Sequence, residues 1–349
     1  MPTQTMPTIL VTGAAGFIGS NFVRFVLEGG HDVKIVAYDK LTYAGNLGNL
    51  TDLLEKFGSS RLVFVKGDVC DAQLLQRVWN EHGVSQVVHF AAETHVDRSI
   101  LGSAPFVQTN VVGTQVLLDV AKAGKVEKFL QVSTDEVYGT LPEDRPEIKF
   151  TETTPLSPNS PYSASKAAAD CLVRAYFHTF AMPVLITRCS NNYGPYHFPE
   201  KLIPLFVTNL IEGKKVPLYG DGLNVRDWLY VQDHCEALWR VLKDGRPGEI
   251  YNIGGNNEIN NQTITRIILR EMGRDWDASV QYVKDRPGHD RRYAIDAGKI
   301  CRELGWSPRH RFEQAIKTTI QWYRDHEAWW RQIKSGEYLK YYQTQYAQR

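Results

Sequence analysis

The sequence predicts an α/β fold in which a doubly wound parallel sheet is followed by a smaller C-terminal lobe. In the first half of the chain, short β-branched runs bounded by turn residues alternate with amphipathic stretches of helical period. After about residue 190 this alternation gives way to irregular, proline-containing sequence. A chain of 349 residues also exceeds the roughly 250–300 residues at which one hydrophobic core stops growing. We therefore assign residues 1–190 to the sheet domain and residues 191–349 mainly to a second lobe, with some segments returning to the sheet.

Six apolar runs are the expected strands, and each is rich in β-branched or aromatic residues: Thr8–Thr12, Val33–Tyr38, Leu62–Lys66, Gln86–Phe90, Phe129–Ser133 and Val184–Arg188. Helical patterning fills the gaps between them, in Gly16–Glu28, Ala72–Glu81, Pro105–Ala123 and Ser160–Phe180. Continuous apolar strands joined by crossover helices are typical of a parallel sheet that is buried on both faces.

Prolines and a glycine turn interrupt the second half of the chain, at Pro195, Pro199, Pro204, Pro217 and Gly220–Gly222. Short strands and helices are expected between these breaks. The C-terminal helices carry several tryptophans without an obvious chemical function, and we expect their rings to pack in a core or an interface.

Composition argues against several classes of function. The 40 basic and 39 acidic residues give a net charge of +1, so no global field would draw the chain to nucleic acid or anionic lipid. No uncharged stretch is apolar enough to span a membrane, and residues 1–8 lack the basic start and apolar core of a secretory signal. The five cysteines form no CxxC pair, and the histidines form no metal-ligand spacing. We therefore expect a cytoplasmic protein with reduced thiols and no metal.

A strand runs into a glycine loop and then a helix near the start of the chain. Gly13, Gly16 and Gly19 would let backbone amides approach a pyrophosphate at the positive end of the helix. Asp39 follows at the end of the next strand, where a carboxylate accepts from both ribose hydroxyls and repels a 2′-phosphate. The pattern favours NAD over NADP, and a tight structural turn is the alternative. The Gly-x-x-Gly-x-x-Gly spacing resembles that of the short-chain dehydrogenase/reductase superfamily.

Tyr162 and Lys166 are four residues apart in an expected helix, so both side chains lie on one face. An ammonium close to a phenol lowers the pKa of the phenol, so Tyr162 would take a hydroxyl proton near neutral pH. The same spacing occurs by chance as an exposed pair. Downstream of a glycine loop, and with Ser133 ending a strand upstream, it predicts a hydride-transfer site with Tyr162 as the base.

Thr134, Asp135 and Glu136 follow an expected strand, at the end where α/β folds bind ligands. They can serve one site only if the chain turns there, because consecutive strand residues face opposite sides. Two neighbouring carboxylates suit a divided task, in which one donates a proton while the other abstracts one. A polar loop that caps the next turn explains these residues equally well.

Eight longer strings resemble the dTDP-glucose 4,6-dehydratase family, in register over nearly the whole chain: residues 12–19, 39–46, 95–100, 133–139, 162–166, 190–204, 226–231 and 286–293. The related UDP-hexose 4-epimerases and UDP-glucuronate decarboxylases share the glycine loop and the Tyr-x-x-x-Lys pair. They do not typically carry Asp-Glu after Ser-Thr. The resemblance therefore implies that Thr134, Asp135 and Glu136 are catalytic, together with Tyr162 and Lys166.

The resemblance also implies which residues contact coenzyme and substrate. Positions that match NAD contacts are Gly13, Gly16, Phe17, Ile18, Gly19, Asp39, Lys40, Leu41, Thr42, Asp68, Val69, Phe90, Ala91, Ala92, Glu93, Thr94, Thr109, Tyr162, Lys166 and Asn192. Positions that match sugar-nucleotide contacts are Thr94, Thr134, Asn191, Glu200, Lys201, Leu202, Arg226, Asn261, Arg286, His289 and Arg292. Asp68 would accept from the adenine amino group, and Arg226 and Arg292 would clamp phosphate oxygens. Thr94 keeps the hydroxyl of a commoner serine, whereas the loop before Asn261 departs from the family in composition.

The implied activity is dehydration of dTDP-glucose to dTDP-4-keto-6-deoxyglucose, in deoxysugar biosynthesis such as that of dTDP-rhamnose. Tyr162 would remove the C4 hydroxyl proton while NAD⁺ takes the C4 hydride. Glu136 would then take the C5 proton as Asp135 protonates the leaving C6 hydroxyl, and the hydride would return to C6. A homodimer formed through two helices of each subunit, Pro105–Ala123 and Ser160–Phe180, is also implied. The alternatives are an epimerase or decarboxylase on the same scaffold and a non-catalytic NAD-sensing regulator.

Overall fold

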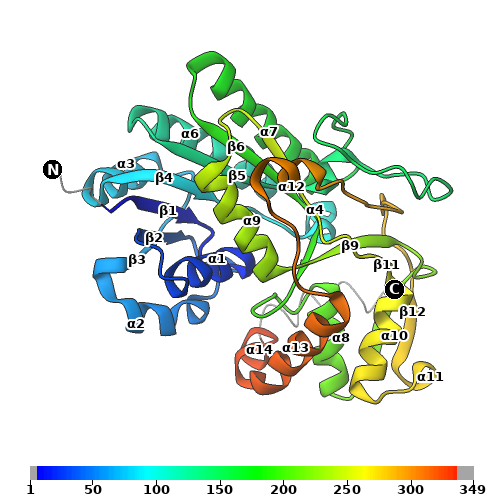
Figure 1. Cartoon of the computed structure of the whole chain (residues 1–349). Coiled ribbons are helices and arrows are strands. Elements are labelled where there is room, and N and C mark those ends of the chain that lie inside the picture. The colour runs from blue at the N-terminus through cyan, green and yellow to red at the C-terminus, as the bar shows by residue number, and fades with distance from the viewer. Residues whose placement is uncertain (1–5, 336–349) are drawn as a thin grey trace.

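The computed structural model describes residues 6–335 of the chain (Figure 1). Residues 1–5, from the segment expected to lack a secretory signal, and residues 336–349, assigned by sequence to the second lobe, lie outside the described residues. Helices cover both faces of a central sheet, and a smaller lobe lies to one side of it (Figure 1). Between residues 6 and 335, no helix combines the length and the apolar character needed to cross a membrane.

The central sheet has seven strands in the spatial order β10-β6-β5-β4-β1-β2-β3, and all neighbouring strands are parallel. Its strands are β1 (Thr8–Thr12), β2 (Lys34–Asp39), β3 (Leu62–Lys66), β4 (Val84–His89), β5 (Lys128–Thr134), β6 (Val184–Cys189) and β10 (Ile250–Ile253). The chain moves outward from β1 to β3 and then returns to β4 on the other side of β1. Ligand crevices of such sheets open at this reversal, beyond the carboxyl ends of the strands. The predicted doubly wound fold is confirmed, and each expected strand lies within two residues of the observed one.

Alternate strand residues pack against helices on opposite faces of the sheet. Ile9 and Val11 of β1 join a buried cluster with α1 (Phe17–Glu28) and α9 (Val231–Asp244). Leu10 belongs to the cluster on the other face, which is covered by α3 (Ala72–His82), α6 (Gly113–Ala123) and α7 (Pro161–Phe180). Because both faces are buried, the strands are apolar throughout, and this is why they read as continuous runs.

Local signals set the start of α7, which carries the Tyr-x-x-x-Lys pair. The Ser160 hydroxyl accepts from the backbone N–H of Ser163 at 3.0 Å, and the Ser163 hydroxyl accepts from the backbone N–H of Ser160 at 3.0 Å. Pro161 occupies the first turn, where its missing N–H costs no hydrogen bond. This capping box satisfies two donors and fixes where the helix begins.

The sheet domain has further short elements: η1 (Leu47–Asn49), α2 (Thr51–Arg61), α4 (Val96–Leu101) and α12 (Gly298–Leu304). The sequence patterns did not predict α2 or α4. Helix α2 has a mixed composition and a break at Gly58 (φ 61°), and α4 spans only six residues, so neither gives a clear helical period.

One expected helix is divided in three. Over Pro105–Ala123 the structure has α5 (Ala104–Phe106), a wider π-helical segment η2 (Val107–Val112) and then α6. The amide of Asn110 pairs with the backbone N–H and carbonyl of Glu93 at 2.8 and 3.0 Å, and it donates to the Ser165 hydroxyl at 2.8 Å. The wider turn thus serves to tie the segment after β4 to α7.

The second lobe has its own hydrophobic core and two small sheets, β11-β9-β7 and β12-β8. Its elements are β7 (Asn191–Tyr193), α8 (Leu202–Ile211), β8 (Val216–Tyr219), β9 (Val225–Tyr230), β11 (Glu258–Asn260), α10 (Asn261–Met272), α11 (Trp276–Ser279), β12 (Val280–Val283), α13 (Phe312–Asp325) and α14 (Glu327–Ile333). Trp330 is fully buried in this core. Three segments of the second half lie in the sheet domain: β10 pairs with β6, and α9 and α12 pack with the sheet. The domain boundary at residue 190 stays a prediction.

Candidate active site

A cavity of about 400 Å³ opens at the carboxyl ends of β1, β4 and β5, where the strand order reverses. The second lobe forms the other wall, through residues 189–206, 217–219 and 286–289. A volume of this size suits a small-molecule ligand enclosed between two lobes.

Nearly all the site residues predicted from sequence line this cavity. They are Gly13, Gly16, Phe17, Ile18, Gly19, Asp39, Lys40, Thr42, Asp68, Val69, Phe90, Ala91, Ala92, Glu93, Thr94, Thr109, Thr134, Asp135, Glu136, Tyr162, Lys166, Asn191, Asn192, Glu200, Lys201, Leu202, Arg226, Asn261, Arg286 and His289. Two predicted contacts, Leu41 and Arg292, are not among the lining residues.

The glycine loop between β1 and α1 is shaped by close backbone contacts. Gly13 has a positive φ of 68°, and a Cβ there would lie 2.7 Å from the backbone nitrogen of Ala91. A Cβ on Gly19 would lie 2.2 Å from the carbonyl oxygen of Gly13. Helix α1 begins after Gly16 without a side-chain cap, so the N–H groups of its first turn are left for a ligand. The positive end of the helix at the cavity therefore suits a phosphate group.

Asp39 ends β2 with its carboxylate at the cavity. Its Oδ2 accepts from the backbone N–H of Ala15 at 2.9 Å, and its Oδ1 accepts from the backbone N–H of Leu41 at 2.7 Å. Burial raises the pKa of Asp39, and these two bonds act to lower it. Each oxygen can accept a further bond, as recognition of a ribose diol requires. Leu41 lies between the lining residues Lys40 and Thr42, and its backbone, at φ 56°, turns back so that its N–H holds Asp39. Its contact with the coenzyme stays a prediction.

A second carboxylate follows β3. Burial acts to raise the pKa of Asp68, but the Lys40 ammonium, 2.6 Å from Oδ2, and the backbone N–H of Cys70 at 2.9 Å outweigh it, and the pKa is lowered. Asp68 is therefore an ionised acceptor at the cavity wall.

Tyr162 projects from α7 into the cavity among acidic neighbours. Burial raises the pKa of Tyr162 well above its ordinary value, and Glu136, Cys189 and Asp135 raise it further. A hydrogen bond with Thr134 acts to lower it. The phenol therefore holds its proton firmly while the nearby carboxylates are charged.

Lys166, one turn further along α7, is also buried. Its ammonium donates to the carbonyl of Val132 on β5 at 2.8 Å, and burial lowers its pKa while Asp170 raises it. The prediction that Lys166 lowers the pKa of Tyr162 is wrong for this arrangement. The ammonium bonds to the strand, and the groups beside the phenol act in the opposite sense.

Three consecutive residues reach the cavity because β5 ends in a tight turn. The strand stops at Thr134, and the 3₁₀ helix η3 (Asp135–Tyr138) starts at once. The Thr134 hydroxyl accepts from the backbone N–H of Glu136 at 3.3 Å and lies 3.3 Å from Asp135 Oδ1. The turn satisfies the geometric condition for Thr134, Asp135 and Glu136 to serve one site.

The two carboxyl groups of this turn lie in different electrostatic surroundings. Burial raises the pKa of Asp135 well above its ordinary value, and the charges of Glu136 and Asp227 add to the rise. Burial also raises the pKa of Glu136, and the cations of Arg286 and Lys201 oppose this rise without cancelling it. Asp135 is thus the group suited to donate a proton, and Glu136 the group suited to accept one.

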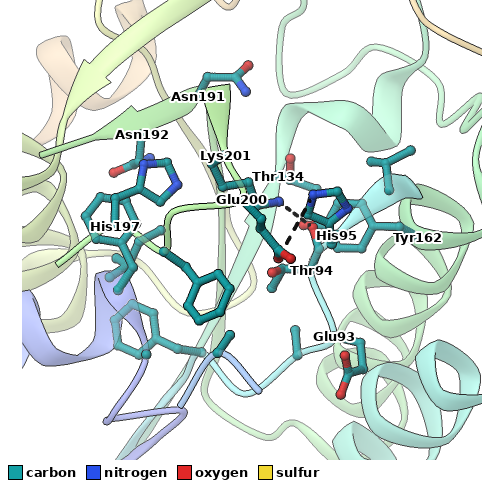
Figure 2. Close-up of a pocket in the computed structure, with 18 of the residues that line it drawn as sticks. Glu93, Thr94, His95, Thr134, Tyr162, Asn191, Asn192, His197, Glu200 and Lys201 are labelled. Carbon is teal, nitrogen blue, oxygen red and sulfur yellow. Dashed lines mark hydrogen bonds and ion pairs between the residues drawn. The ribbon is translucent and has the colours of Figure 1, made fainter. Parts of the chain in front are cut away.

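Figure 2 shows Glu200 and Lys201, from the loop before α8, directed toward Thr94 and His95 of the sheet domain. Glu200 accepts from the guanidinium of Arg98 at 3.1 Å, and His95 Nε2 lies 4.0 Å from its other oxygen. The Lys201 ammonium donates to the carbonyl of Thr94 at 3.0 Å. Opposite charges on this loop therefore anchor the second lobe to the segment that follows β4.

The two arginines predicted to clamp phosphate differ in their placement. Arg226 of β9 lines the cavity and lies over the ring of Tyr293, 4.2 Å from its centroid. Arg292 donates to the carbonyls of Pro146 and Ile148 at 2.8 and 3.0 Å and pairs with Glu258 at 2.9 Å. The prediction for Arg292 is wrong, because these partners occupy its guanidinium outside the cavity.

The lining residues without a predicted role include the polar side chains of His95, Asp97, His197 and Tyr219. His95 and Asp97 lie in one of the strings that carry the family resemblance, which was an available signal. His197 stacks on Phe17 of the glycine loop, with ring centroids 4.1 Å apart. It also lies in a resembling string, residues 190–204. Tyr219 lies in none of these strings, and no local pattern marks it. In the described part of the chain, no three His, Cys, Asp or Glu side chains are grouped so as to hold a metal ion.

Comparison with known proteins adds a family and relatives. The family model described as GDP-mannose 4,6 dehydratase matches residues 10–319. The chain is 52% identical over 350 residues to the dTDP-glucose 4,6-dehydratase of Xanthomonas campestris pv. campestris (strain B100), covering 95% of this chain and 97% of that one. The crystal structure of DesIV, a dTDP-glucose 4,6-dehydratase from Streptomyces venezuelae with NAD and TYD bound, is 51% identical with a TM-score of 0.89, covering 94% and 100%. The UDP-glucose 4-epimerase of Thermotoga maritima, with UDP-glucose, is 28% identical with a TM-score of 0.82, covering 91% and 99%.

Proposed function

The chain belongs to the GDP-mannose 4,6-dehydratase family, and we propose that it converts dTDP-glucose to dTDP-4-keto-6-deoxyglucose in deoxysugar biosynthesis. The observation that carries the proposal is the pair of buried carboxyl groups, Asp135 and Glu136, beside Tyr162 in a cavity that also contains a dinucleotide-type glycine loop. Oxidation alone needs one base, whereas dehydration also needs an acid and a second base.

The coenzyme end of the cavity fits NAD. A side chain at Gly13 or Gly19 would collide with backbone, and the uncapped start of α1 offers N–H donors to a pyrophosphate. Asp39 would accept from the ribose hydroxyls and repel a 2′-phosphate. NAD supplies the acceptor for the hydride of sugar C4 and the donor for C6.

We assign Tyr162 as the base for the C4 hydroxyl. The charges of Glu136 and Asp135 raise the pKa of this phenol, so protonation of either carboxyl group lowers it. Asp135, whose pKa burial raises, therefore favours the phenolate when it carries its proton. The Thr134 hydroxyl, which bonds to the phenol, would steady the same charge. We assign Lys166 to contact the coenzyme beside Tyr162.

We assign the elimination to the turn after β5. The C4 ketone acidifies the C5 hydrogen, and Glu136 takes that proton; its pKa is raised by burial, and the cations of Arg286 and Lys201 oppose that rise. Asp135 gives its proton to the C6 oxygen, so water leaves. Glu136 then returns a proton to C5. The difference in surroundings of the two carboxyl groups supports this division.

The second lobe supplies the groups for the nucleotide and the sugar. We assign Arg226 and Arg286 to the diphosphate, and Glu200, Lys201 and Asn191 to the sugar. Buried guanidinium groups that line the cavity match phosphate oxygens in both charge and fork geometry.

The working enzyme is proposed to be a cytoplasmic homodimer built through the η2–α6 and α7 helices. Val107 and Val112 of η2 are exposed, as apolar residues of a subunit interface are before assembly. All five cysteines are free, as in a reducing compartment.

Incubation with dTDP-glucose and UDP-glucose separately tests the function. We expect dTDP-glucose to yield a product lighter by one water, in the presence of NAD and without net coenzyme reduction. An isomer of unchanged mass would indicate a 4-epimerase instead. No turnover with any nucleotide sugar would favour an NAD-binding regulator.

A further inference from the structure

A carboxylate that the proposed reaction does not use lies where the two lobes meet at the cavity. Asp97, on α4 of the sheet domain, lines the cavity and is 4% exposed. Its Oδ2 accepts from the Tyr219 hydroxyl at 3.2 Å, and its Oδ1 lies 3.5 Å from NH1 of Arg286. Tyr219 ends β8 and Arg286 follows β12, so one carboxylate contacts two segments of the second lobe.

Arg286 lines the cavity and has a guanidinium nitrogen without a hydrogen-bond partner in the described part of the chain. Its contact with Asp97 involves NH1, whereas its buried Nε has no hydrogen-bond partner among residues 6–335. Burial acts to lower the pKa of Arg286, and the charges of Asp97 and Glu136 outweigh it, so the group stays a cation. A buried donor without a partner on a half-buried cation is costly unless a ligand anion accepts from it.

Tyr219 is held in the same assembly. Its hydroxyl bonds to Asp97, and its ring packs edge-on against His289, with centroids 6.2 Å apart. All four of these residues, Asp97, Tyr219, Arg286 and His289, line the cavity. A change at Asp97 therefore reaches both the ring and the cation.

We propose that Asp97 is a positioning residue for the substrate's diphosphate, which it serves by aiming Arg286 and Tyr219 from the opposite lobe. The proposal rests on the proposed function, because it takes the ligand to be a nucleotide diphosphate. The opposing effect is repulsion between Asp97 and the phosphates. The gain from orienting Arg286 outweighs this repulsion, because Arg286 already compensates the charge of the Asp97 carboxylate, which also attracts Lys201.

The test is Asp97→Asn, which keeps the shape and one oxygen for Tyr219 but removes the charge opposite Arg286. Binding of dTDP is measured by calorimetry, together with KM and kcat for dTDP-glucose. We expect the Kd for dTDP and the KM to rise about tenfold or more, because a buried charge pair is broken. We expect kcat to stay within about threefold, because Asp97 acts at the diphosphate and not at the reacting sugar carbons.

Repeating Asp97→Asn in a variant that lacks Arg286 shows whether Asp97 acts through the arginine or by stabilising the fold in general. With Arg286→Ala already present, Asp97→Asn should weaken dTDP binding much less than in the wild-type background, or tighten it, because only Tyr219 remains to be aimed and the carboxylate, without Arg286, repels the phosphates. A matched control is Asp221→Asn, which breaks an exposed Asp–Arg pair with Arg291 at 2.7 and 2.9 Å outside the cavity lining. It should leave the Kd for dTDP unchanged. Thermal unfolding of each variant checks that it is folded.

Unchanged or tighter binding of dTDP by Asp97→Asn would overturn the proposal. Equal effects of Asp97→Asn in the wild-type and Arg286→Ala backgrounds would also overturn it, because the residue would then act on the fold and not through the arginine. Failure of the wild-type protein to bind dTDP and to dehydrate dTDP-glucose is a different result, which would overturn the proposed function itself.

Discussion

The two ends of the cavity are built on different physical principles. The coenzyme end is shaped mainly by the stretch from β1 to β2 and by the segment after β4, and it relies on close backbone packing at Gly13 and Gly19. The reacting end gathers buried ionisable side chains from the end of β5, α7 and the second lobe, such as Asp135, Tyr162 and Arg226. Shape therefore selects the coenzyme, whereas reactivity comes from charges that the fold keeps away from water.

Two aspartates make the contrast concrete. Asp39, at the coenzyme end, has a backbone N–H donor on each oxygen. Asp135, at the reacting end, is 1% exposed, and its Oδ2 has no hydrogen-bond partner in the described part of the chain. The first is held as an acceptor, and the second is poised to carry a proton. Substitutions at each end should therefore fail in different ways.

The largest effect is expected from Gly13→Ala at the coenzyme end. The new Cβ would meet the backbone of Phe90 and Ala91 at 2.7–2.9 Å, in a left-handed backbone conformation. We expect the free energy of unfolding to fall by about 3 kcal/mol or more, and the purified protein to lack NAD. Gly30→Ala is the matched control, because Gly30 also has positive φ but nothing within 4 Å. It should cost only about 1–2 kcal/mol and keep NAD.

Tyr162→Phe should stop the reaction at sugar C4 without changing the binding of NAD. Loss of the base for the C4 hydroxyl should lower turnover of dTDP-glucose by about 10²–10⁴. The NAD content of the purified protein should be unchanged, and no reduced coenzyme should form on adding substrate. Wild-type turnover in this variant would remove Tyr162 from the mechanism.

Asp39→Asn should weaken the preference of the protein for NAD over NADP. The amide keeps an acceptor for one of the two backbone N–H groups but loses the negative charge that repels a 2′-phosphate. We expect the preference for NAD over NADP in binding to the apoprotein to fall by about tenfold, which corresponds to 1.4 kcal/mol. An unaltered preference would show that another group discriminates between the coenzymes.

The smallest effect is expected in the stability of Asp135→Asn. Because the folded-state pKa of Asp135 is raised above 3.8, the folded protein binds more protons than the unfolded chain above that pH. Stability is therefore lost as pH rises from about 3.8 through the raised pKa. The amide escapes this loss, so the variant should unfold at higher temperature than wild type at pH 7. The gain should shrink toward pH 4; no gain at pH 7 would contradict the raised pKa.

The same contrast explains what the sequence could predict. The strands and the glycine loop follow from local patterns, because both depend on residues close together in the chain. The bulge at η2 was not predictable, since it depends on Asn110 bonding to Glu93 and Ser165 far along the chain. The prediction that Arg292 clamps phosphate was wrong for a similar reason. Its partners are carbonyls about 145 residues away in the chain, and no sequence spacing reveals such contacts.

The electrostatics of the site were the least predictable part. Spacing put Lys166 beside Tyr162, but the ammonium bonds to Val132, and the acidic groups that control the phenol come from another strand. The family resemblance supplied residue identities, and the fold supplied their charges and burial. Hence Asp97 stood in a resembling string without a role until its contacts across the lobes were seen.

The most direct test of the account is Glu136→Gln, because the account separates oxidation from elimination by residue. The variant should hold NAD and oxidise C4 through Tyr162, but lack the base for the C5 hydrogen. Mixed with dTDP-glucose, it should accumulate reduced coenzyme, seen by its absorbance, while loss of water falls by about 10²–10⁴. Dehydration at the wild-type rate, with no accumulation of reduced coenzyme, would show that Glu136 is not the base and would contradict the account.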